Sequence, residues 1–399
     1  MANVHPSAFV LAFAFVTTAC LQPPATSSGS WLKGNMHTHS LWSDGNDFPE
    51  MIVDWYRQRG YRFLVLTDHN ILSRGEKWML VSEIVRRGGR KALADYRLTF
   101  GEDWVETRGE GKDLAVRLRG LEEFRPRLEQ PGKFILIEGE EVSDRFGSLP
   151  IHINASNLTE LIKPQGGKSV REVIERNLRA IEAQEKKLGR PILGHLNHPN
   201  FHYAVTPEDL AHAVSENFFE VYNGHPSVAQ LGDANHPSID RLWDIANTIR
   251  VAKLKSHPLF GLAVDDSHNY HNTSGSSPGR GWVMVRGDDL NADSIITAMK
   301  RGDFYASSGV TLRDVRYSGE EGLLEIEVDP VPGESYRTEF IGTLVGYDAA
   351  VEPVEMKDAG GKVARTLHRY SSDVGKVLAE AKGVSASYKL KGNEYYVRA

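Results

Sequence analysis

Short apolar runs alternate with amphipathic stretches between Trp31 and about Gly302, and this alternation predicts strands joined by helices. The predicted strands are Trp31–His37, Arg62–Leu66, Phe134–Ile137, Ile151–Asn154, Ile192–Leu196, Phe218–Tyr222, Phe260–Val264 and Trp282–Val285. The predicted helices are Pro49–Arg59, Ser169–Leu188, Pro207–Val214, Ser238–Ala252 and Asn291–Arg301. Such an alternation favours an α/β fold of parallel strands with crossover helices, as in a barrel or a doubly wound sheet.

Two parts of the chain lack this alternation of predicted strands and helices. Residues 71–131 are charged, punctuated by Gly and partly helical in pattern, which predicts an insertion into the α/β unit. From Thr311 the stretches "TLRDVRYS", "GLLEIEVDP", "RTEFIGT", "ARTLHRY" and "EYYVRA" predict short strands without helices between them. We therefore expect an α/β unit at residues 31–309 and a small β-sandwich-like domain at residues 310–399.

The first 30 residues form a separate segment that contains no Lys, Arg, Asp or Glu. The apolar run Ala8–Cys20 is too short to span a bilayer, and it fits the core of a secretory signal followed by a Ser/Pro-rich tether, Leu21–Ser30. "TTAC" resembles a bacterial lipoprotein signal, in which Cys20 becomes the lipidated first residue. We expect an exported protein, periplasmic or tethered to a membrane through Cys20, with an ordinary cleaved signal or a frayed N-terminus as the alternatives.

Composition and charge narrow the class of protein. The 399 residues include 25% charged and 40% hydrophobic residues, which is ordinary for a soluble globular protein. A net charge of −6 gives no excess of positive charge that would attract nucleic acid, so we expect no nucleic-acid partner. The single cysteine excludes an intramolecular disulfide. Of the 15 histidines, all but His5 and His368 lie between His37 and His271, which indicates one His-rich unit.

Histidine and carboxylate side chains recur at or near the ends of successive predicted strands. They are His37 and His39 with Asp44, Asp68 and His69, Glu138, Glu140 and Glu141, His152, His195 and His198, and Asp266 and His268. Each one alone has an ordinary explanation as a surface or capping residue. Their recurrence favours a metal site, because the C-terminal ends of barrel strands converge on one mouth. His and Asp/Glu ligands without Cys suit Zn, Mn or Fe.

The motifs "MHTHSLWSDG", "GYRFLVLTDHN", "EEVS", "NHPN" and "AVDDSH", in this order, resemble the PHP (polymerase and histidinol phosphatase) superfamily. "PGRGWVMV", "AMKRGDFYASSG" and the terminal "YYVRA" are similar to its stand-alone carbaryl-hydrolase-like metallohydrolases. The resemblance runs from about Leu32 to Ala399. It implies a distorted (β/α)7 barrel with two or three divalent metal ions at its mouth.

The resemblance also implies a ligand set. It consists of His37, His39, Glu141 and Asp266 for a first ion, Glu141 as a bridge with His152 and His198 for a second, and Asp44, His69 and His268 for a third. Asp68 is implied to orient its neighbours.

Two of these assignments involve a choice between neighbouring residues. Glu141 is preferred to Glu138 and Glu140 because it opens "EVS", and it precedes His152 at the spacing of the family pattern. His198 is preferred to His195 because the ligand in the family pattern precedes Pro.

These features predict a metal-dependent hydrolase of a small-molecule ester, since a water between two divalent ions loses its proton near neutral pH. Phosphoester cleavage is the first expectation, carboxyl or carbamate ester hydrolysis the alternative, and a non-catalytic metal- or glycan-binding lipoprotein the third. The candidates to face the substrate are Asn223, His225, His271 and Arg280. Arg280 either clamps phosphate through a bidentate contact or pairs with a surface carboxylate.

Overall fold

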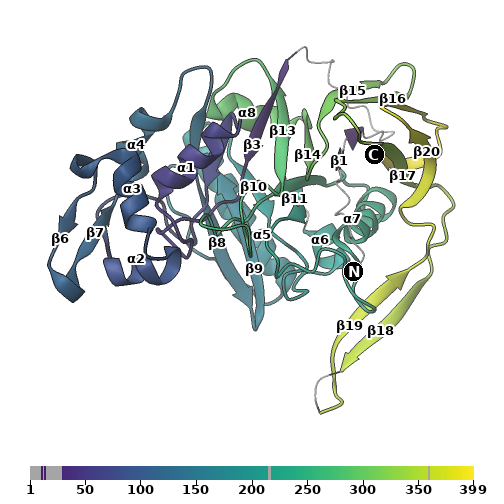
Figure 1. Ribbon diagram of the computed structural model, residues 1–399. Helices are drawn as coiled ribbons and strands as arrows, with labels where there is room; N and C mark the ends of the chain where they lie inside the picture. The colour runs from purple at the N-terminus through teal and green to yellow at the C-terminus, as the bar shows by residue number, and fades with distance from the viewer. Residues whose placement is uncertain (1–9, 12, 15–28, 214–216, 358–359) are drawn as a thin grey trace.

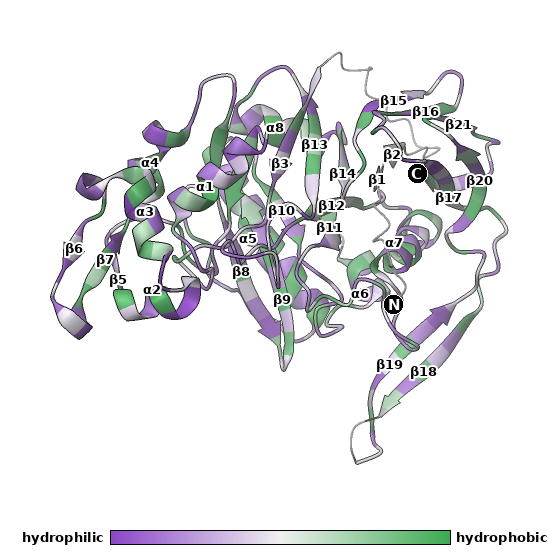
Figure 2. Ribbon diagram, in the orientation of Figure 1, coloured by the Kyte–Doolittle hydropathy of each residue, from purple (hydrophilic) through white to green (hydrophobic). Residues whose placement is uncertain are grey.

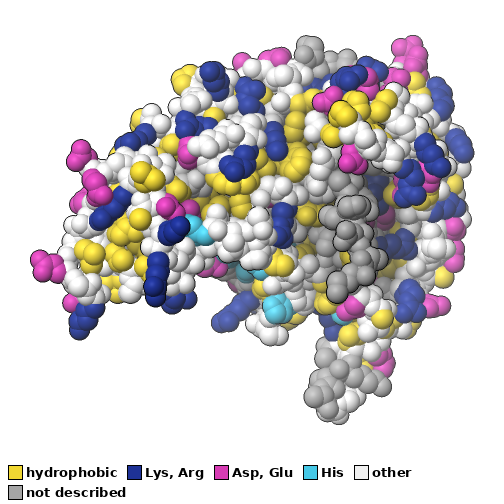
Figure 3. All heavy atoms as spheres, in the orientation of Figure 1, with side chains coloured by type: hydrophobic (Ala, Val, Ile, Leu, Met, Phe, Trp, Pro, Cys, Tyr) yellow, Lys and Arg dark blue, Asp and Glu magenta, His cyan; other side chains and the backbone are white. Residues whose placement is uncertain are grey.

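The computed structural model describes residues 10–11, 13–14, 29–213, 217–357 and 360–399. Cys20, with its expected lipid, and most of the expected tether lie outside the described residues. Among the described helices, none combines the length and the apolar character needed to cross a membrane. On the face shown in Figure 3, the described Lys and Arg side chains are interspersed with Asp and Glu, without an extended patch of one sign.

A large mixed sheet forms the centre of the molecule (Figure 1), in the strand order β1-β14-β13-β3-β4-β8-β9-β10-β11-β12. Its strands are β1 (Val10–Leu11), β3 (Ser30–Asn35), β4 (Phe63–Leu66), β8 (Ile135–Phe146), β9 (Leu149–Ser156), β10 (Leu193–Leu196), β11 (Phe218–Asn223), β12 (Phe260–Val264), β13 (Trp282–Gly287) and β14 (Phe304–Ser307). A parallel bridge between Thr38 and Ser267 joins the segment after β3 to the segment after β12. The sheet therefore curls into a nearly closed, barrel-like form.

The strand directions differ from the all-parallel expectation. The sets β3-β4-β8 and β10-β11-β12 are parallel, whereas β9 is antiparallel to both β8 and β10, and β13 is antiparallel to both β3 and β14. Only Gly147 and Ser148 connect β8 to β9, which is too short for a crossover helix. Gly147 has a positive φ of 59°, a conformation that suits Gly in such a tight turn.

Helices cover this sheet, and their starts follow local signals in the sequence. They are α1 (Pro49–Gln58), α5 (Val170–Leu188), α6 (Pro207–His212), α7 (Ile239–Thr248) and α8 (Ala292–Lys300). The Ser169 hydroxyl accepts from Glu172 N at the start of α5, and Thr206 and Asp209 form a reciprocal capping box on α6. Hydrophobic and hydrophilic residues share each helix in Figure 2, as expected of helices that bury one face.

The predicted insertion leaves the barrel between β4 and β8 and lies at the left of Figure 1. It combines α2 (Val81–Gly88), α3 (Ala92–Phe100) and α4 (Leu121–Leu128) with a small sheet of β5 (Lys77–Leu80), β7 (Ala115–Leu118) and β6 (Thr107–Arg108). The Phe48 and Tyr96 rings stack at 3.8 Å and join the insertion to the segment before α1. The helices agree with the partly helical expectation, and the sheet was not predicted.

The C-terminal region adds sheets without helices. The first sheet contains β15 (Leu312–Ser318), β16 (Leu323–Val328) and β21 (Ser385–Lys389). The second contains β2 (Phe13–Ala14), β22 (Glu394–Arg398), β17 (Arg337–Leu344) and β20 (Lys376–Lys382). The third is a two-stranded ribbon of β18 (Val351–Lys357) and β19 (Val363–Tyr370). Ile326, Phe340 and Tyr388 share a core with Met284 and Tyr305 of the barrel sheet. The first two of these sheets therefore pack directly against β13 and β14.

One buried ion pair also ties this region to the α/β unit. Arg398 of β22 donates through Nε and Nη2 to the two carboxylate oxygens of Asp244 on α7, at 2.8 and 2.7 Å. The two side chains are 6% and 4% exposed. The Tyr396 hydroxyl donates to the same carboxylate at 3.0 Å. The paired charges are therefore satisfied within the protein.

Candidate metal centre

Glu141, which is 1% exposed, lies at the middle of a cluster of imidazoles. Its Oε2 lies 3.5 Å from His37 Nε2, 3.3 Å from His39 Nε2 and 2.8 Å from His69 Nδ1. Its Oε1 lies 2.9 Å from His152 Nδ1 and 3.4 Å from His198 Nε2. One carboxylate thus faces imidazoles that come from the ends of three strands, β3, β4 and β10, and from β9.

The first group of donors has the dimensions of a tetrahedral metal site. His37 Nε2 and His39 Nε2 lie 3.0 Å apart, and they lie 3.3 and 3.2 Å from Asp266 Oδ1. Candidate ligand atoms of His37, His39 and Glu141 all lie within 4.8 Å of one another, and Asp266 joins this group through its contacts with the two imidazoles. Ligands placed at about 2.0–2.1 Å around a tetrahedral Zn²⁺ are separated from one another by about 3.3–3.4 Å. The observed separations are close to that geometry.

Two further observations fit a cation at this position. Glu141 Oε2 is buried and has no hydrogen-bond partner among the described residues, which costs free energy unless a cation satisfies it. His37 Nδ1 lies 2.6 Å from Glu220 Oε1, and this contact assigns the proton to Nδ1 and leaves the lone pair of Nε2 directed at Glu141. The carboxylate–imidazole–metal arrangement is the usual form of a histidine ligand.

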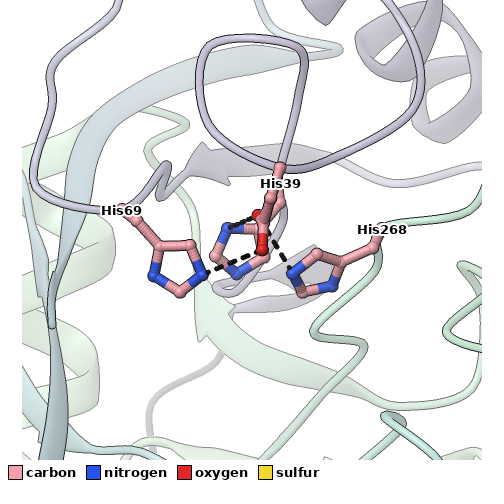
Figure 4. A group of neighbouring side chains, drawn as sticks. His39, His69 and His268 are labelled. Carbon is pink, nitrogen blue, oxygen red and sulfur yellow. Dashed lines mark ion pairs between the residues drawn. The ribbon is translucent and has the colours of Figure 1, made fainter. Parts of the chain in front are cut away.

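His152 and His198, near Glu141 Oε1, form a second group of donors with that carboxylate. A third group, Asp44, His69 and His268, lies on the outer side of His39. Asp44 Oδ1 is 3.2 Å from His268 Nε2, and Asp44 Oδ2 is 3.4 Å from His69 Nε2. The rings of His39, His69 and His268 point toward one another in Figure 4 from the segments that follow β3, β4 and β12. Candidate ligand atoms of these four residues all lie within 4.8 Å of one another. Because the Asp44 side chain is 55% exposed, this group is open to solvent.

The electrostatics of the cluster suit a divalent cation. Burial opposes ionisation of Glu141, but the neighbouring imidazoles outweigh it and hold its pKa well below the usual range. Burial, together with the proximity of His268 and His69, lowers the pKa of His39 to about 3. Glu141 is therefore anionic and His39 neutral at physiological pH. These two groups have the ionisation states that metal ligands require. Burial opposes protonation of His69, but Glu141 and Asp44 raise its pKa to about 11, so a metal ion bound there would displace a proton.

Backbone strain is present at two of the candidate ligands. His198 has φ 22° and Asp266 has φ 48°, both in the left-handed region that L-residues rarely adopt. Such strain persists where surrounding contacts hold it, and it is common at functional sites. The loop after His198 is held from outside the barrel, because Arg365 of β19 donates to the carbonyls of Tyr203 and Ala204 at 2.8 and 3.1 Å.

Asp68 supports the loop that carries Asp44. Its Oδ1 accepts from Ser40 N at 2.8 Å and from Ser43 Oγ at 2.6 Å, and its Oδ2 accepts from Ser40 Oγ at 2.7 Å. All of these contacts are with the segment 40–43, so both oxygens of the buried Asp68 carboxylate are engaged there. These bonds hold the segment 40–43 against the strand end that carries Asp68.

The remaining candidates differ in their relation to the cluster. The His225 ring lies 5.4 Å from the His268 ring, beside the third donor group. The Arg280 guanidinium donates to Gly224 O at 2.9 Å and to Ser277 Oγ at 3.1 Å, so it ties loops together. His271 Nε2 contacts Asn46 O at 3.1 Å, so the structure does not bring it into any of the donor groups.

Glu220 of β11 is a functional candidate that lies outside the sequence motifs. It is fully buried, and besides His37 its carboxylate contacts His195 Nε2 at 3.4 Å and accepts from His198 N at 2.7 Å and from Asn223 Nδ2 at 2.8 Å. A carboxylate inside the apolar run "FFEVYN" is itself a signal, because Glu is rarely buried without a partner. His195 is thereby placed against Glu220 rather than in a donor group.

Replacing Glu220 with Gln is expected to weaken metal binding about 10–100-fold, the usual effect of removing a carboxylate behind a histidine ligand. The amide can no longer hold the proton of His37 on Nδ1 as an anion does. Competition with a chromophoric chelator measures the affinity. Glu182→Gln on the outer face of α5 is the matched control, and equal affinities in the two variants would contradict the assignment.

No family model and no curated protein matches the chain. Solved structures that it resembles include a two-domain protein from Bacteroides vulgatus containing a predicted PHP-like metal-dependent phosphoesterase, with 15% identity, a TM-score of 0.42, and coverage of 96% of this chain and 92% of that one. A proposed metal-dependent phosphoesterase from Bifidobacterium adolescentis has 12% identity and a TM-score of 0.33 over 67% of this chain and 96% of that one. An amidohydrolase from Chromobacterium violaceum has 19% identity and a TM-score of 0.17 over 39% of each chain.

Proposed function

We propose that this chain is a metal-dependent hydrolase of the PHP type that cleaves phosphoesters of small molecules. The observation that carries the proposal is the Glu141 carboxylate, whose two oxygens face separate sets of imidazoles and one of whose oxygens is buried without a hydrogen-bond partner among the described residues. A carboxylate in this position suits a bridge between two cations.

The residues that would hold metal are those of the family resemblance, supported by the compact donor groups and, for Asp266 and His198, by their contacts with His37 and Glu141. They are His37, His39, Glu141 and Asp266 for a first ion, Glu141, His152 and His198 for a second, and Asp44, His69 and His268 for a third. When bound, divalent ions supply an activated water near neutral pH and stabilise the charge that develops on the ester oxygens.

The protein's own part is to orient these ligands. Glu220 holds the proton of His37 on Nδ1. Asn197 Nδ2 donates to Glu141 Oε1 at 2.8 Å, and Asn223 Nδ2 donates to Asp266 Oδ2 at 3.1 Å. These bonds restrict the rotation of both carboxylates, so that little reorganisation is needed when cation and substrate bind. We assign His225, next to His268, to the substrate side of the site.

Carboxyl or carbamate ester hydrolysis on the same metals is the second candidate. This candidate is supported by the hydrogen bonds of Arg280. Its guanidinium already donates to Gly224 O, Ser277 Oγ and Thr273 O. A phosphoryl transition state spreads charge over several oxygens and rewards cationic groups beyond the metals. Since Arg280 is held by the loops, the preference for phosphate depends on the metals and on any other cation near the site.

A panel of substrates tests the proposal. The protein loaded with Mn, Zn or Fe is expected to hydrolyse p-nitrophenyl phosphate or its diester faster than p-nitrophenyl acetate or a naphthyl carbamate. Chelation is expected to abolish the activity, and restoring the metal should recover it, because the nucleophile depends on the ions. Preference for the acetate or the carbamate would promote the second candidate. Inactivity toward the whole panel at full metal content would refute a hydrolase.

A further inference from the structure

A cavity of about 670 Å³ opens beside the proposed second metal position. His152 forms part of its wall, together with Arg145 and Pro150 of the β8–β9 hairpin and with Phe201 and His202 of the loop after β10. Its volume lies within the range of about 300–1,000 Å³ that is usual for small-molecule sites. A substrate held by its ester group at His152 therefore has space for the rest of its body in this cavity.

The register of the β8–β9 hairpin determines which side chains face the cavity. Glu141 pairs with Asn154, Ser143 with His152, and Arg145 with Pro150. Side chains two residues apart on a strand lie on one face, so Glu141, Ser143 and Arg145 follow one another on the face that carries the site. At about 3.4 Å per residue, Arg145 lies about 7 Å beyond Ser143 and about 14 Å beyond Glu141 along β8.

Arg145 is free to bind a ligand. Among the described residues, its guanidinium has no ion pair or hydrogen bond, and it is the one Arg or Lys side chain in the cavity wall. The adjacent carboxylate is engaged elsewhere, since Asp144 Oδ2 accepts from Gly166 N at 2.8 Å and from Asn177 Nδ2 at 2.9 Å. An unpaired guanidinium at this distance from the ester position can bind an anionic group of the substrate through two parallel hydrogen bonds.

We propose that Arg145 selects phosphoesters that carry a second anionic group, a carboxylate or a phosphate, at the end of the molecule remote from the scissile bond. This inference rests on the proposed phosphoesterase function and adds the class of substrate. The span between Arg145 and the donor groups, about 7–14 Å along the strand, matches an extended chain of five or six carbons between the two anions.

Two substrates that differ only at the remote end provide the test. Sorbitol 6-phosphate and 6-phosphogluconate share a linear six-carbon chain, and the second ends in a carboxylate where the first ends in a hydroxymethyl group. The native protein is expected to favour 6-phosphogluconate at least tenfold in kcat/KM, mainly through a lower KM. Arg145→Ala is expected to reduce this ratio to within about twofold of one, and Arg145→Lys, which keeps the charge but loses the bidentate fork, to an intermediate value.

Binding without turnover provides a second readout. Calorimetry on the chelated protein is expected to show at least fivefold weaker binding of 6-phosphogluconate by Arg145→Ala. Arg176→Ala, which removes an exposed arginine paired with Glu172 on α5, is the matched control and is expected to keep both the ratio and the affinity. An unchanged ratio in Arg145→Ala, or no preference in a native protein that cleaves p-nitrophenyl phosphate, would overturn the inference alone. Failure of the native protein to cleave any phosphoester would overturn the proposed function. In that case, equal calorimetric binding of 6-phosphogluconate by the native protein and by Arg145→Ala would overturn the role of Arg145 as well.

Discussion

Replacing Glu141 with Gln is expected to lower kcat for p-nitrophenyl phosphate about a thousandfold or more, with roughly half or more of the bound metal lost. Removing one electrostatic contact to the reacting group already reduces kcat by about 10²–10³. Both oxygens of Glu141 face donor groups, so the substitution acts on two positions at once. A glutamine side chain has one oxygen, and its NH₂ group cannot serve as a metal ligand.

Elemental analysis of the purified variants, alongside the kinetics, checks this expectation. Glu140→Gln is the matched control, because Glu140 lies next in the chain but on the opposite face of β8, where its Oε1 accepts from Ile162 N at 2.5 Å. The control is expected to retain metal and most of the activity. Native metal content and native rates in Glu141→Gln would show that the carboxylate does not bridge cations.

Replacing Arg398 with Ala is expected to lower the free energy of unfolding by about 3–5 kcal/mol, the usual effect of breaking a buried ion pair by removing one partner. The Asp244 carboxylate would stay buried with only the Tyr396 hydroxyl to satisfy its charge. The variant also loses the contact of the guanidinium with the face of Trp243, 4.9 Å from the ring centroid. The docking of β22 on α7 thus depends strongly on this arginine.

Urea unfolding of the single variants Arg398→Ala and Asp244→Ala and of the double variant measures this coupling. The double variant is expected to be less destabilised than the sum of the single variants, since neither charge remains buried alone. Arg369→Ala, an exposed arginine on the β18–β19 ribbon, is the control and is expected to change the unfolding free energy by less than about 0.5 kcal/mol. An unfolding midpoint in Arg398→Ala equal to that of the native protein would contradict the assignment of the pair as a structural tie.

Local signals in the sequence explain which elements could be predicted. The predicted helices match α1, α5, α6, α7 and α8 to within a few residues at each end, because caps such as Ser169 and Thr206 mark where they begin. The strand Phe260–Val264 was also predicted with its observed bounds. By contrast, β8 runs on to Phe146, well beyond the predicted Ile137, since the extension carries polar residues that form no apolar run. Strand direction depends on pairing partners, so the antiparallel β9 could not be seen in local patterns.

The residues of the candidate site also divide into those that local sequence patterns reveal and those that depend on the folded sheet. The motifs that contain His37, His39, His69 and His268 were identified from the sequence because they directly follow apolar strands, and strand ends converge in the folded barrel. Glu220 and Arg145 belong to no motif, and their importance depends on which side chains the sheet register places opposite them. For Arg280 the sequence left open a phosphate clamp or an ion pair with a surface carboxylate. The carbonyls that engage it lie in loops whose course the sequence pattern did not predict.

The bridge between Thr38 and Ser267 has a consequence for biosynthesis. Asp266, whose N donates to His37 O at 3.0 Å, leaves the ribosome more than two hundred residues after His37 and His39. Pairings of such long sequence separation form late and slow the folding reaction, even though the entropy of closing a long loop grows only slowly with its length. We therefore expect a nascent chain to lack the complete first donor group until the segment after β12 has docked, so that metal uptake is a post-translational step rather than a nucleus for folding.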